Sequence, residues 1–328
     1  MKRTRSTARW CTSTTATPCS SSASTCPSSD AEDTSMNADL DVACHLNVLV
    51  ADAAPERLGT ALDALAAAGY RRVVLPPLDP ETADAAALAR AFADRGLAPI
   101  TIAGQMPTAD VSSSDAAVRA DGAAMLRAAL DLTVALGGDQ MNGVPYGPFG
   151  GPTAPVGRDA FERAAIEVGR IADEAHERGV TMTFEVLNRY ETAVVNTAAQ
   201  AMDFVAASGS DHLRIHLDTF HMAVEEADLA AAIRTALPKL GYLELGQSGR
   251  GALSSGVVDV VDVVRQALDD GYRGRWGVEA FSRSVLPAPV ADMLAIWREP
   301  YDDGLELAAD ALRVIDAGRK ASTAGRAA

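Results

Sequence analysis

The sequence repeats one pattern eight times after Asp41: a short run of β-branched or apolar residues, then a longer alanine-rich amphipathic segment. Short apolar runs are typical of buried strands, and segments with helical periodicity indicate amphipathic helices. Eight such pairs predict a (β/α)8 barrel, a fold that typically needs about 250 residues. The expected strands lie at 43–50, 71–76, 98–104, 139–144, 180–185, 212–218, 241–246 and 275–281. The expected helices lie at 55–68, 81–95, 114–136, 158–178, 197–207, 228–237, 258–268 and 303–316.

A doubly wound open sheet is the competing architecture for alternating strands and helices. That fold calls for a glycine-rich phosphate-binding turn after its first strand. The corresponding segment reads NVLVADAAPER and contains no GxGxxG. The barrel is therefore the better interpretation, and we expect residues 41–320 to form it as one domain.

Three of the expected strands carry an acidic residue at or near their carboxyl end. Glu185 follows VTMTF, Asp218 ends HLRIHLD and Glu279 ends RWGVE. Moving an unpaired carboxylate into a low-dielectric interior costs roughly several kcal/mol, so each acid needs a cation, hydrogen-bond donors or a raised pKa. Active sites of barrels lie at the carboxyl ends of the strands. The sequence therefore predicts that the three acids converge there and carry the chemistry.

The formal net charge of −15 limits the class of partner. Nucleic acid and anionic membrane surfaces repel a strongly acidic chain, so neither is expected as a partner. A metal ion or a small neutral molecule suits this charge better, although surplus acid also keeps a surface soluble. The sequence contains no run of about 18 uncharged apolar residues that would predict a membrane-spanning helix.

Cysteine usage indicates a reducing compartment. Cys11, Cys19 and Cys26 lie in the first segment, and only Cys44 lies in the expected barrel. Neither a disulfide framework nor a zinc-finger spacing can be made from this distribution. We therefore expect a cytoplasmic protein.

Both ends of the chain differ in composition from the expected barrel. Residues 1–40 are rich in serine and threonine and have no periodicity, so they are expected to be disordered, as is the tail at 321–328. The first segment lacks the apolar stretch of a secretory signal. A transit peptide fits its composition, and translation from an upstream start, with Met36 as the natural beginning, is the plainer account.

Several motifs together resemble one known family. FEVLNRYETAVVNT, HLDTFHMAVEE and GYRGRWGVEAF, and more weakly SSSDAAVRADG, are similar to segments of the ketose 3-epimerases. This group of D-tagatose, D-allulose and L-ribulose 3-epimerases belongs to the xylose-isomerase-like barrels. The resemblance implies an enzyme that inverts C3 of a free ketose with a divalent metal ion (Mn, Co or Mg), and that assembles as a homodimer or homotetramer.

The resemblance also implies roles for individual residues. Glu185 and Glu279 correspond to metal ligands that also act as the acid/base pair, and Asp218 corresponds to a further metal ligand. The residues that correspond to substrate contacts of the family are Glu191, His221 and Arg250.

The remaining metal ligand departs from the family pattern. The family has a histidine six residues before the substrate-binding arginine, whereas YLELGQSGR places Glu244 there, with Tyr242 two residues earlier. Both side chains are expected to face the barrel interior. A site of Glu185, Asp218, Glu244 and Glu279 would offer oxygen ligands only, which favours hard ions such as Mg, Mn or Ca. Alternatively, Glu244 pairs with Arg250, and metal binding is weakened or lost.

Two other functions stay open on the sequence. The same superfamily contains polyol dehydratases and lyases of sugar-derived compounds, and a changed seventh strand is compatible with a changed reaction. The barrel is also compatible with a protein that binds sugar without a competent metal site. His216 is expected either to pack in the core or to donate a hydrogen bond to a metal ligand.

Overall fold

The structure, a computed structural model, describes residues 40–325. The disorder expected for residues 1–40 concerns a segment that, up to residue 39, lies outside the described residues. Within the described range, no helix combines the length and the apolar character needed to cross a lipid bilayer.

Eight parallel strands form a closed barrel, in which each strand pairs with its sequence neighbours and the first pairs with the last. The predicted (β/α)8 architecture is confirmed. Its strands are β1 Val42–His45, β2 Arg72–Val74, β3 Ala98–Ala103, β4 Gln140–Gly143, β5 Thr181–Val186, β6 Arg214–Asp218, β7 Leu240–Gly246 and β8 Arg275–Glu279.

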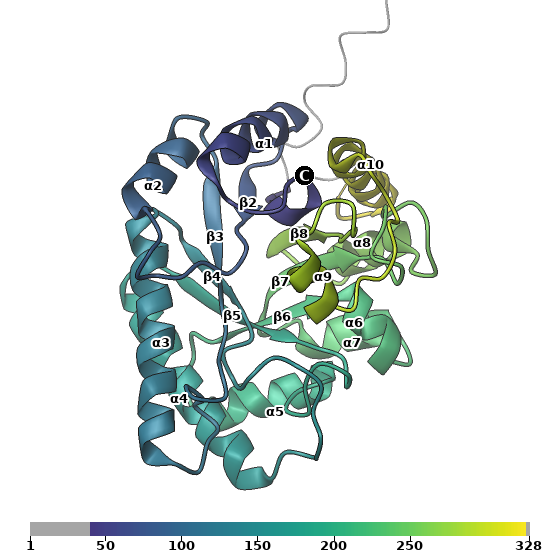
Figure 1. Cartoon of the computed structure of the whole chain (residues 1–328). Coiled ribbons are helices and arrows are strands. Elements are labelled where there is room, and N and C mark those ends of the chain that lie inside the picture. The colour runs from purple at the N-terminus through teal and green to yellow at the C-terminus, as the bar shows by residue number, and fades with distance from the viewer. Residues whose placement is uncertain (1–39, 326–328) are drawn as a thin grey trace, which may run out of the picture. The chain divides into compact units, whose positions relative to one another are not determined.

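Helices follow the strands and lie outside the barrel (Figure 1). The predicted bounds of α1 agree with the structure: proline occupies its first turn, and Gly69 ends it with a φ of 103°. Two short helices, α6 and α9, were not predicted. The helices are α1 Pro55–Ala68, α2 Ala85–Ala93, α3 Ala116–Ala135, α4 Arg158–Glu177, α5 Ala198–Ser208, α6 Thr219–Glu225, α7 Leu229–Ala236, α8 Val260–Asp269, α9 Ala288–Met293 and α10 Gly304–Ala321, and a 3-10 turn, η1, spans Leu46–Val48.

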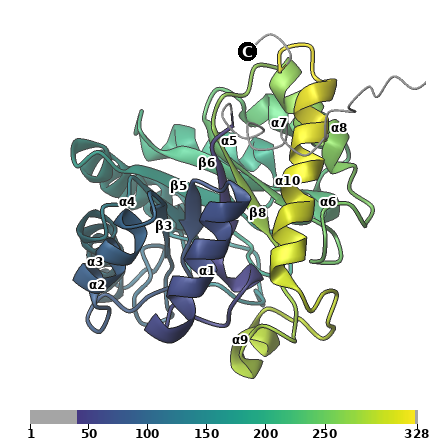
Figure 2. The same ribbon diagram turned by 90° about the horizontal axis from the view of Figure 1, so that it is seen from above.

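Closure of the barrel joins distant parts of the sequence. Strand β1 pairs with β8 from Val42 opposite Trp276 to Cys44 opposite Val278. On the outside, α1 and α10 lie side by side (Figure 2). The hydroxyl of Tyr70 also donates a hydrogen bond to the carbonyl of Ala308, over 2.8 Å. The carboxyl ends of the first and last strands are therefore neighbours.

Most of the core lies between the strands and the helices, and a smaller apolar cluster fills the barrel interior. This inner cluster consists of Ala43, Val74, Ile100 and Tyr242. Interior side chains of a barrel stack in layers, and the layer above Tyr242 on β7 contains Glu244. The polar site therefore rests on an apolar floor.

Charged residues close the opposite, amino-terminal end of the barrel. Arg72, at the start of β2, donates to Asp139 over 2.5 Å and to Asp41 over 2.8 Å. Arg275, at the start of β8, donates to the other oxygen of Asp139 over 2.6 Å. Residues at this face of a barrel usually serve stability rather than catalysis.

The chain continues in defined contacts beyond α10. Ser322 is fully buried, and its hydroxyl donates to Asp269 over 2.7 Å. The hydroxyl of Thr323 donates to the same oxygen over 2.8 Å. Residues up to 325 of the expected tail are thus attached to the end of α8, and residues 326–328 lie outside the described part.

Candidate active site

Four carboxylates lie on the consecutive strands β5 to β8. Asp218 and Glu279 are the last residues of β6 and β8, and Glu185 and Glu244 lie near the ends of β5 and β7. Asp218 and Glu244 are fully buried, and Glu279 is 7% exposed. The convergence of strand-end acids that the sequence predicts is therefore present at the carboxyl end of the barrel.

Arg250 connects two of these acids. Its Nη1 lies 3.2 Å from Oδ2 of Asp218 and also contacts Oε2 of Glu279. The guanidinium is 3.5 Å from the ring centroid of Phe220, and the residue has a φ of 57°, a conformation that is costly for arginine. Arg250 therefore pairs with Asp218 and Glu279, and the alternative in which it pairs with Glu244 is wrong.

Glu244 lies instead between two imidazole rings. Its Oε1 is 2.9 Å from Nε2 of His45, and its Oε2 is 3.0 Å from Nε2 of His216. Burial favours the neutral carboxyl, but the two histidines outweigh it and hold the pKa of Glu244 below its usual range. Burial likewise favours neutral His45, whereas Glu244 and Glu279 raise the pKa of His45 to about 9.

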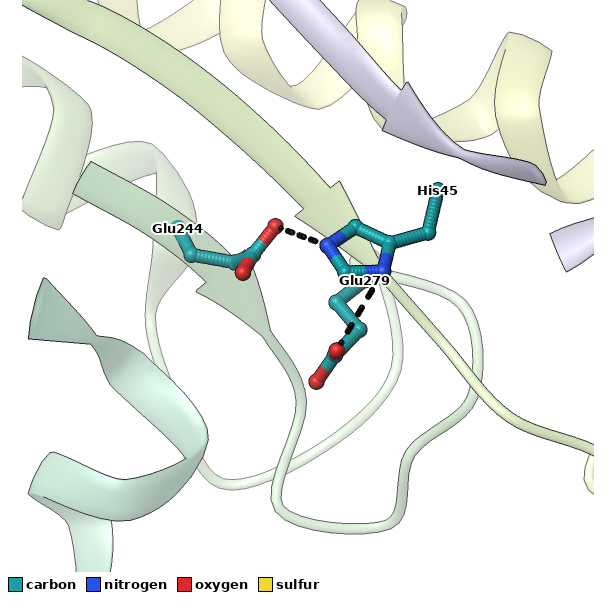
Figure 3. A group of neighbouring side chains, drawn as sticks. All are labelled: His45, Glu244 and Glu279. Carbon is teal, nitrogen blue, oxygen red and sulfur yellow. Dashed lines mark ion pairs between the residues drawn. The ribbon is translucent and has the colours of Figure 1, made fainter. Parts of the chain in front are cut away.

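His45 also contacts a second acid, as Figure 3 shows. Its Nδ1 lies 3.4 Å from Oε1 of Glu279, so the ring stands between Glu279 and Glu244. His216 contacts Glu244 and packs edge-on against Tyr242 at 4.7 Å between ring centroids. His216 therefore both packs in the interior and lies beside an expected ligand.

Asn188 orients His221. The backbone N–H of Asn188 donates to Nδ1 of His221 over 3.1 Å, so this nitrogen is an acceptor and Nε2 carries the ring proton. Nε2 lies 3.3 Å from Oε1 of Glu185 and 4.0 Å from Oε2 of Glu191. The side-chain amide of Asn188 donates to Glu191 over 2.9 Å. The expected substrate contacts His221 and Glu191 therefore adjoin the expected acid/base Glu185.

The two expected acid/base residues differ in protonation. Burial raises the pKa of Glu279 to about 7, because it outweighs the opposing charges of Arg250 and His45. Burial also disfavours charge on Glu185, but His216 and His221 outweigh it and lower the pKa of Glu185. The pKa values of the two acids are therefore shifted in opposite directions, that of Glu185 toward the ionised form and that of Glu279 toward the neutral form.

Three groups of side chains could hold a metal ion among residues 40–325, each with its ligand atoms within 4.8 Å of one another. Each group contains a histidine, whereas the expected ligand set of Glu185, Asp218, Glu244 and Glu279 contains carboxylates only, and none of the three groups holds all four. The groups are His45 with Glu244 and Glu279, Glu185 with Asp218 and His221, and Glu185 with His216 and Glu244.

Sequence reasoning did not find three residues that shape this site. His45 could have been noticed as a histidine within the first expected strand, 43–50, and Asn188 as part of the motif FEVLNRYE. Gly277 gives no such signal, because its role depends on pairing with Glu244 across β7 and β8. A Cβ at Gly277 would clash with Glu244 and Tyr242, so glycine provides the space for both side chains.

The family profile described as xylose isomerase-like TIM barrel matches residues 62–314. The chain belongs to this family. Barrels of this kind have their active site at the carboxyl ends of the strands, which is where the four carboxylates of this chain lie.

Curated relatives of this xylose isomerase-like barrel are named as epimerases. L-ribulose 3-epimerase of Mesorhizobium japonicum is 35% identical over 277 residues, which cover 84% of this chain and 93% of the relative. Ketose 3-epimerase of Arthrobacter globiformis is 34% identical over 270 residues, which cover 82% and 93%. The resemblance to the ketose 3-epimerases is confirmed, and so is the enzyme class, an isomerase of the epimerase type.

Solved structures show the same similarity. A structure of L-ribulose 3-epimerase superposes with a TM-score of 0.81 at 34% identity and covers 86% of this chain and 96% of that chain. D-allulose 3-epimerase from a Methylomonas species, in complex with D-allulose, gives a TM-score of 0.80 at 32% identity and covers 84% and 96%.

Proposed function

We propose that this protein epimerises a free ketose at C3 with a divalent metal ion, and that Glu185 and Glu279 are its acid/base pair. The observation that carries the proposal is that acids from β5, β6 and β8 lie at the same end of the barrel, where their surroundings lower the pKa of Glu185 and raise that of Glu279. Pairs of titratable groups with separated pKa values are how one site supplies both a base and an acid. The names of the relatives support the substrate class.

The donor set suits a divalent cation. Both oxygens of Glu244 and Nε2 of His45 are buried and have no hydrogen bond of acceptable geometry, although they lie close together. Buried polar atoms without partners are rare, and a cation would satisfy these. The expected ligands are Glu185, Asp218, Glu244 and Glu279. A bound ion supplies a Lewis acid that polarises the substrate carbonyl.

In the proposed reaction the two glutamates exchange the C3 proton. The ionised carboxylate of Glu185 accepts the C3 proton, and the electron pair of that bond moves toward the C2 carbonyl to give an enediolate. The protonated carboxyl of Glu279 then donates a proton to C3 on the opposite face, which inverts the centre. In the reverse direction the two residues exchange roles.

The neighbouring polar groups would hold the sugar. His221 presents an N–H at Nε2 beside Glu185, and Glu191 offers a carboxylate to a substrate hydroxyl. Arg250 would donate its remaining N–H groups to substrate oxygens while it stays in contact with Asp218 and Glu279. These contacts fix the ketose relative to the two glutamates, which lowers the entropic cost of the reaction.

We further propose Mn, Mg or Co as the ion, because carboxylate oxygens dominate the site. A homodimer or homotetramer in the cytoplasm, without nucleic-acid or membrane partners, stays a prediction. Light scattering coupled to size-exclusion chromatography measures the oligomeric state.

The test is deuterium exchange. The metal-loaded enzyme is incubated with D-fructose, D-tagatose or L-ribulose in deuterated water, and NMR follows deuterium at C3 and the appearance of the C3 epimer. We expect both signals for at least one ketose. Glu185→Gln and Glu279→Gln should each lose about 100-fold or more in rate. The control is Glu162→Gln, an exposed acid on α4 that pairs with Arg158.

Two results contradict the proposal. Deuterium exchange without an epimer, or loss of water from a polyol, would favour the dehydratase or lyase alternative. Sugar binding without exchange in the metal-loaded protein would favour the non-catalytic alternative.

A further inference from the structure

The proposed reaction gives no role to His45, a buried side chain of the site. It ends β1, is 6% exposed and contacts two of the expected metal ligands, as described above (Figure 3). Its Nε2 faces Oε1 of Glu244 at 2.9 Å, and its Nδ1 faces Oε1 of Glu279 at 3.4 Å.

The close contact between His45 and Glu244 is an ion pair that does not have the geometry of a good hydrogen bond. Nε2 of His45 and both carboxylate oxygens of Glu244 lack a hydrogen-bond partner, and so do both ring nitrogens of His216 and the hydroxyl of Tyr242. A native interior rarely leaves so many adjacent polar atoms without partners. These atoms belong to Glu244 and to the side chains around it, so a cation that satisfies them would lie beside this carboxylate.

The distances suit a shared cation. Two ligands that lie about 2.1 Å from an ion at a right angle are about 3.0 Å apart. The separation of 2.9 Å between Nε2 of His45 and Oε1 of Glu244 fits this edge. The ligand atoms of His45, Glu244 and Glu279 also lie within 4.8 Å of one another.

We propose that His45 is a nitrogen ligand of the divalent ion, beside Glu244 and Glu279. The inference rests on the proposed function, because the ion that His45 would bind is the divalent ion proposed for the reaction. It assigns the imidazole ligand to the first strand, while the seventh strand contributes a carboxylate. Because imidazole suits the later first-row metals better than Mg or Mn, the site should prefer Co to Mn and Mg.

The competing explanation is that His45 is only a protonated counter-ion of Glu244. In that case the ring carries protons on both nitrogens and no metal can bind to either. The two explanations differ in whether a metal ion contacts a histidine nitrogen, which spectroscopy detects without any turnover.

The experiment is pulsed EPR of the full-length protein loaded with Mn. Electron spin echo modulation reports nitrogen bound directly to Mn, and labelling with 15N-histidine identifies the nitrogen as imidazole. We expect histidine modulation in the wild type and in His216→Gln, and its loss in His45→Gln. The dissociation constant for Mn, from titration calorimetry, should rise about tenfold or more in His45→Gln. Circular dichroism and thermal melting check that each variant folds.

A double variant keeps the test valid if His45→Gln does not fold. The chain has five histidines, of which His176 and His212 stack on each other at 3.6 Å and belong to none of the three ligand groups. In the double variant His216→Gln with His221→Gln, modulation that persists must come from His45. Its persistence supports the inference.

Several outcomes overturn it. Mn binding without histidine modulation in the wild type, or modulation that disappears in His216→Gln or His221→Gln but not in His45→Gln, contradicts a role of His45 as ligand. If such a protein still epimerises a ketose, the proposed function stands without the inference. A protein that binds no divalent ion and exchanges no deuterium at C3 contradicts both.

Discussion

Glu244 shows how one residue changes the chemistry of its surroundings. Where the family pattern has a histidine, this chain has a carboxylate in contact with His45 and His216. The acid is fully buried, so its charge depends on those two rings for compensation. The effect of a glutamate at position 244 therefore depends on His45 and His216.

We expect Glu244→Gln to destabilise the metal-free protein. Removal of one partner from a buried ion pair costs about 3–5 kcal/mol, because the other partner stays buried without compensation. Urea unfolding in EDTA should show a loss of this size for Glu244→Gln and almost none for the exposed Glu162→Gln. Equal stabilities of Glu244→Gln and wild type would mean that the imidazole contacts contribute nothing.

The absence of a side chain at Gly277 leaves the space that the Glu244 carboxylate occupies. We expect Gly277→Ala to destabilise the protein by about 1–3 kcal/mol, because the added methyl group would overlap Glu244 and Tyr242. Calorimetric melting measures the change. The control is Gly104→Ala, next to β3, where an added Cβ meets no atom within 4 Å. If both variants melt alike, the space at Gly277 is not required.

At the scale of elements, β6 and α6 share one residue. Asp218 ends the strand and caps the helix, because its Oδ1 accepts the N–H of Phe220 over 2.8 Å. Its other oxygen faces Arg250 at 3.2 Å. The helix thus fixes the carboxylate in one orientation and leaves one oxygen to the site.

The amino-terminal end of the barrel contributes to stability in a way that depends on pH. Partial burial raises the pKa of Asp139, but Arg72 and Arg275 outweigh burial and lower it. A lowered pKa in the folded state means that the stabilisation is present above the pKa of the unfolded state, about 3.9, and is lost as the pH falls through the folded value.

We therefore expect Asp139→Asn to reduce the free energy of unfolding at pH 7 by about 1 kcal/mol, a modest loss because the side chain is 42% exposed. The difference from wild type should shrink as the pH falls below about 4. Denaturant unfolding at several pH values measures it. Asp211→Asn, at a side chain that is 98% exposed, is the control. A difference that does not change with pH would contradict the assignment.

At the scale of the whole molecule, the ion should stabilise the fold. A ligand that binds only the folded state at 100 times its dissociation constant adds about 2.7 kcal/mol. Excess Mn should therefore raise the melting temperature of the wild type by several degrees, EDTA should reverse the rise, and a double Glu185→Gln, Glu279→Gln variant should respond weakly. An unchanged melting temperature with Mn would argue against ion binding.

Local patterns were enough to predict the architecture and the position of three acids near strand ends. Alternating segments indicate strands and helices, and strand-end acids indicate Glu185, Asp218 and Glu279. The missed helix α6 follows β6 without a loop, so TFHMAVE offers no separate start signal. The contacts of His45 cannot be found in this way, because they depend on which strands close the barrel and on side-chain directions across β1, β7 and β8.

Because the pairing of β1 with β8 closes the barrel, the site can be completed only after the last strand has been synthesised. His45 leaves the ribosome early, whereas its partner Glu279 belongs to the last strand to be synthesised. A nascent chain that has not yet released β8 therefore exposes the acids of the preceding strands without completing this contact. The ability to hold an ion by way of His45 and Glu279 should accordingly appear only at the end of translation, in a single late step.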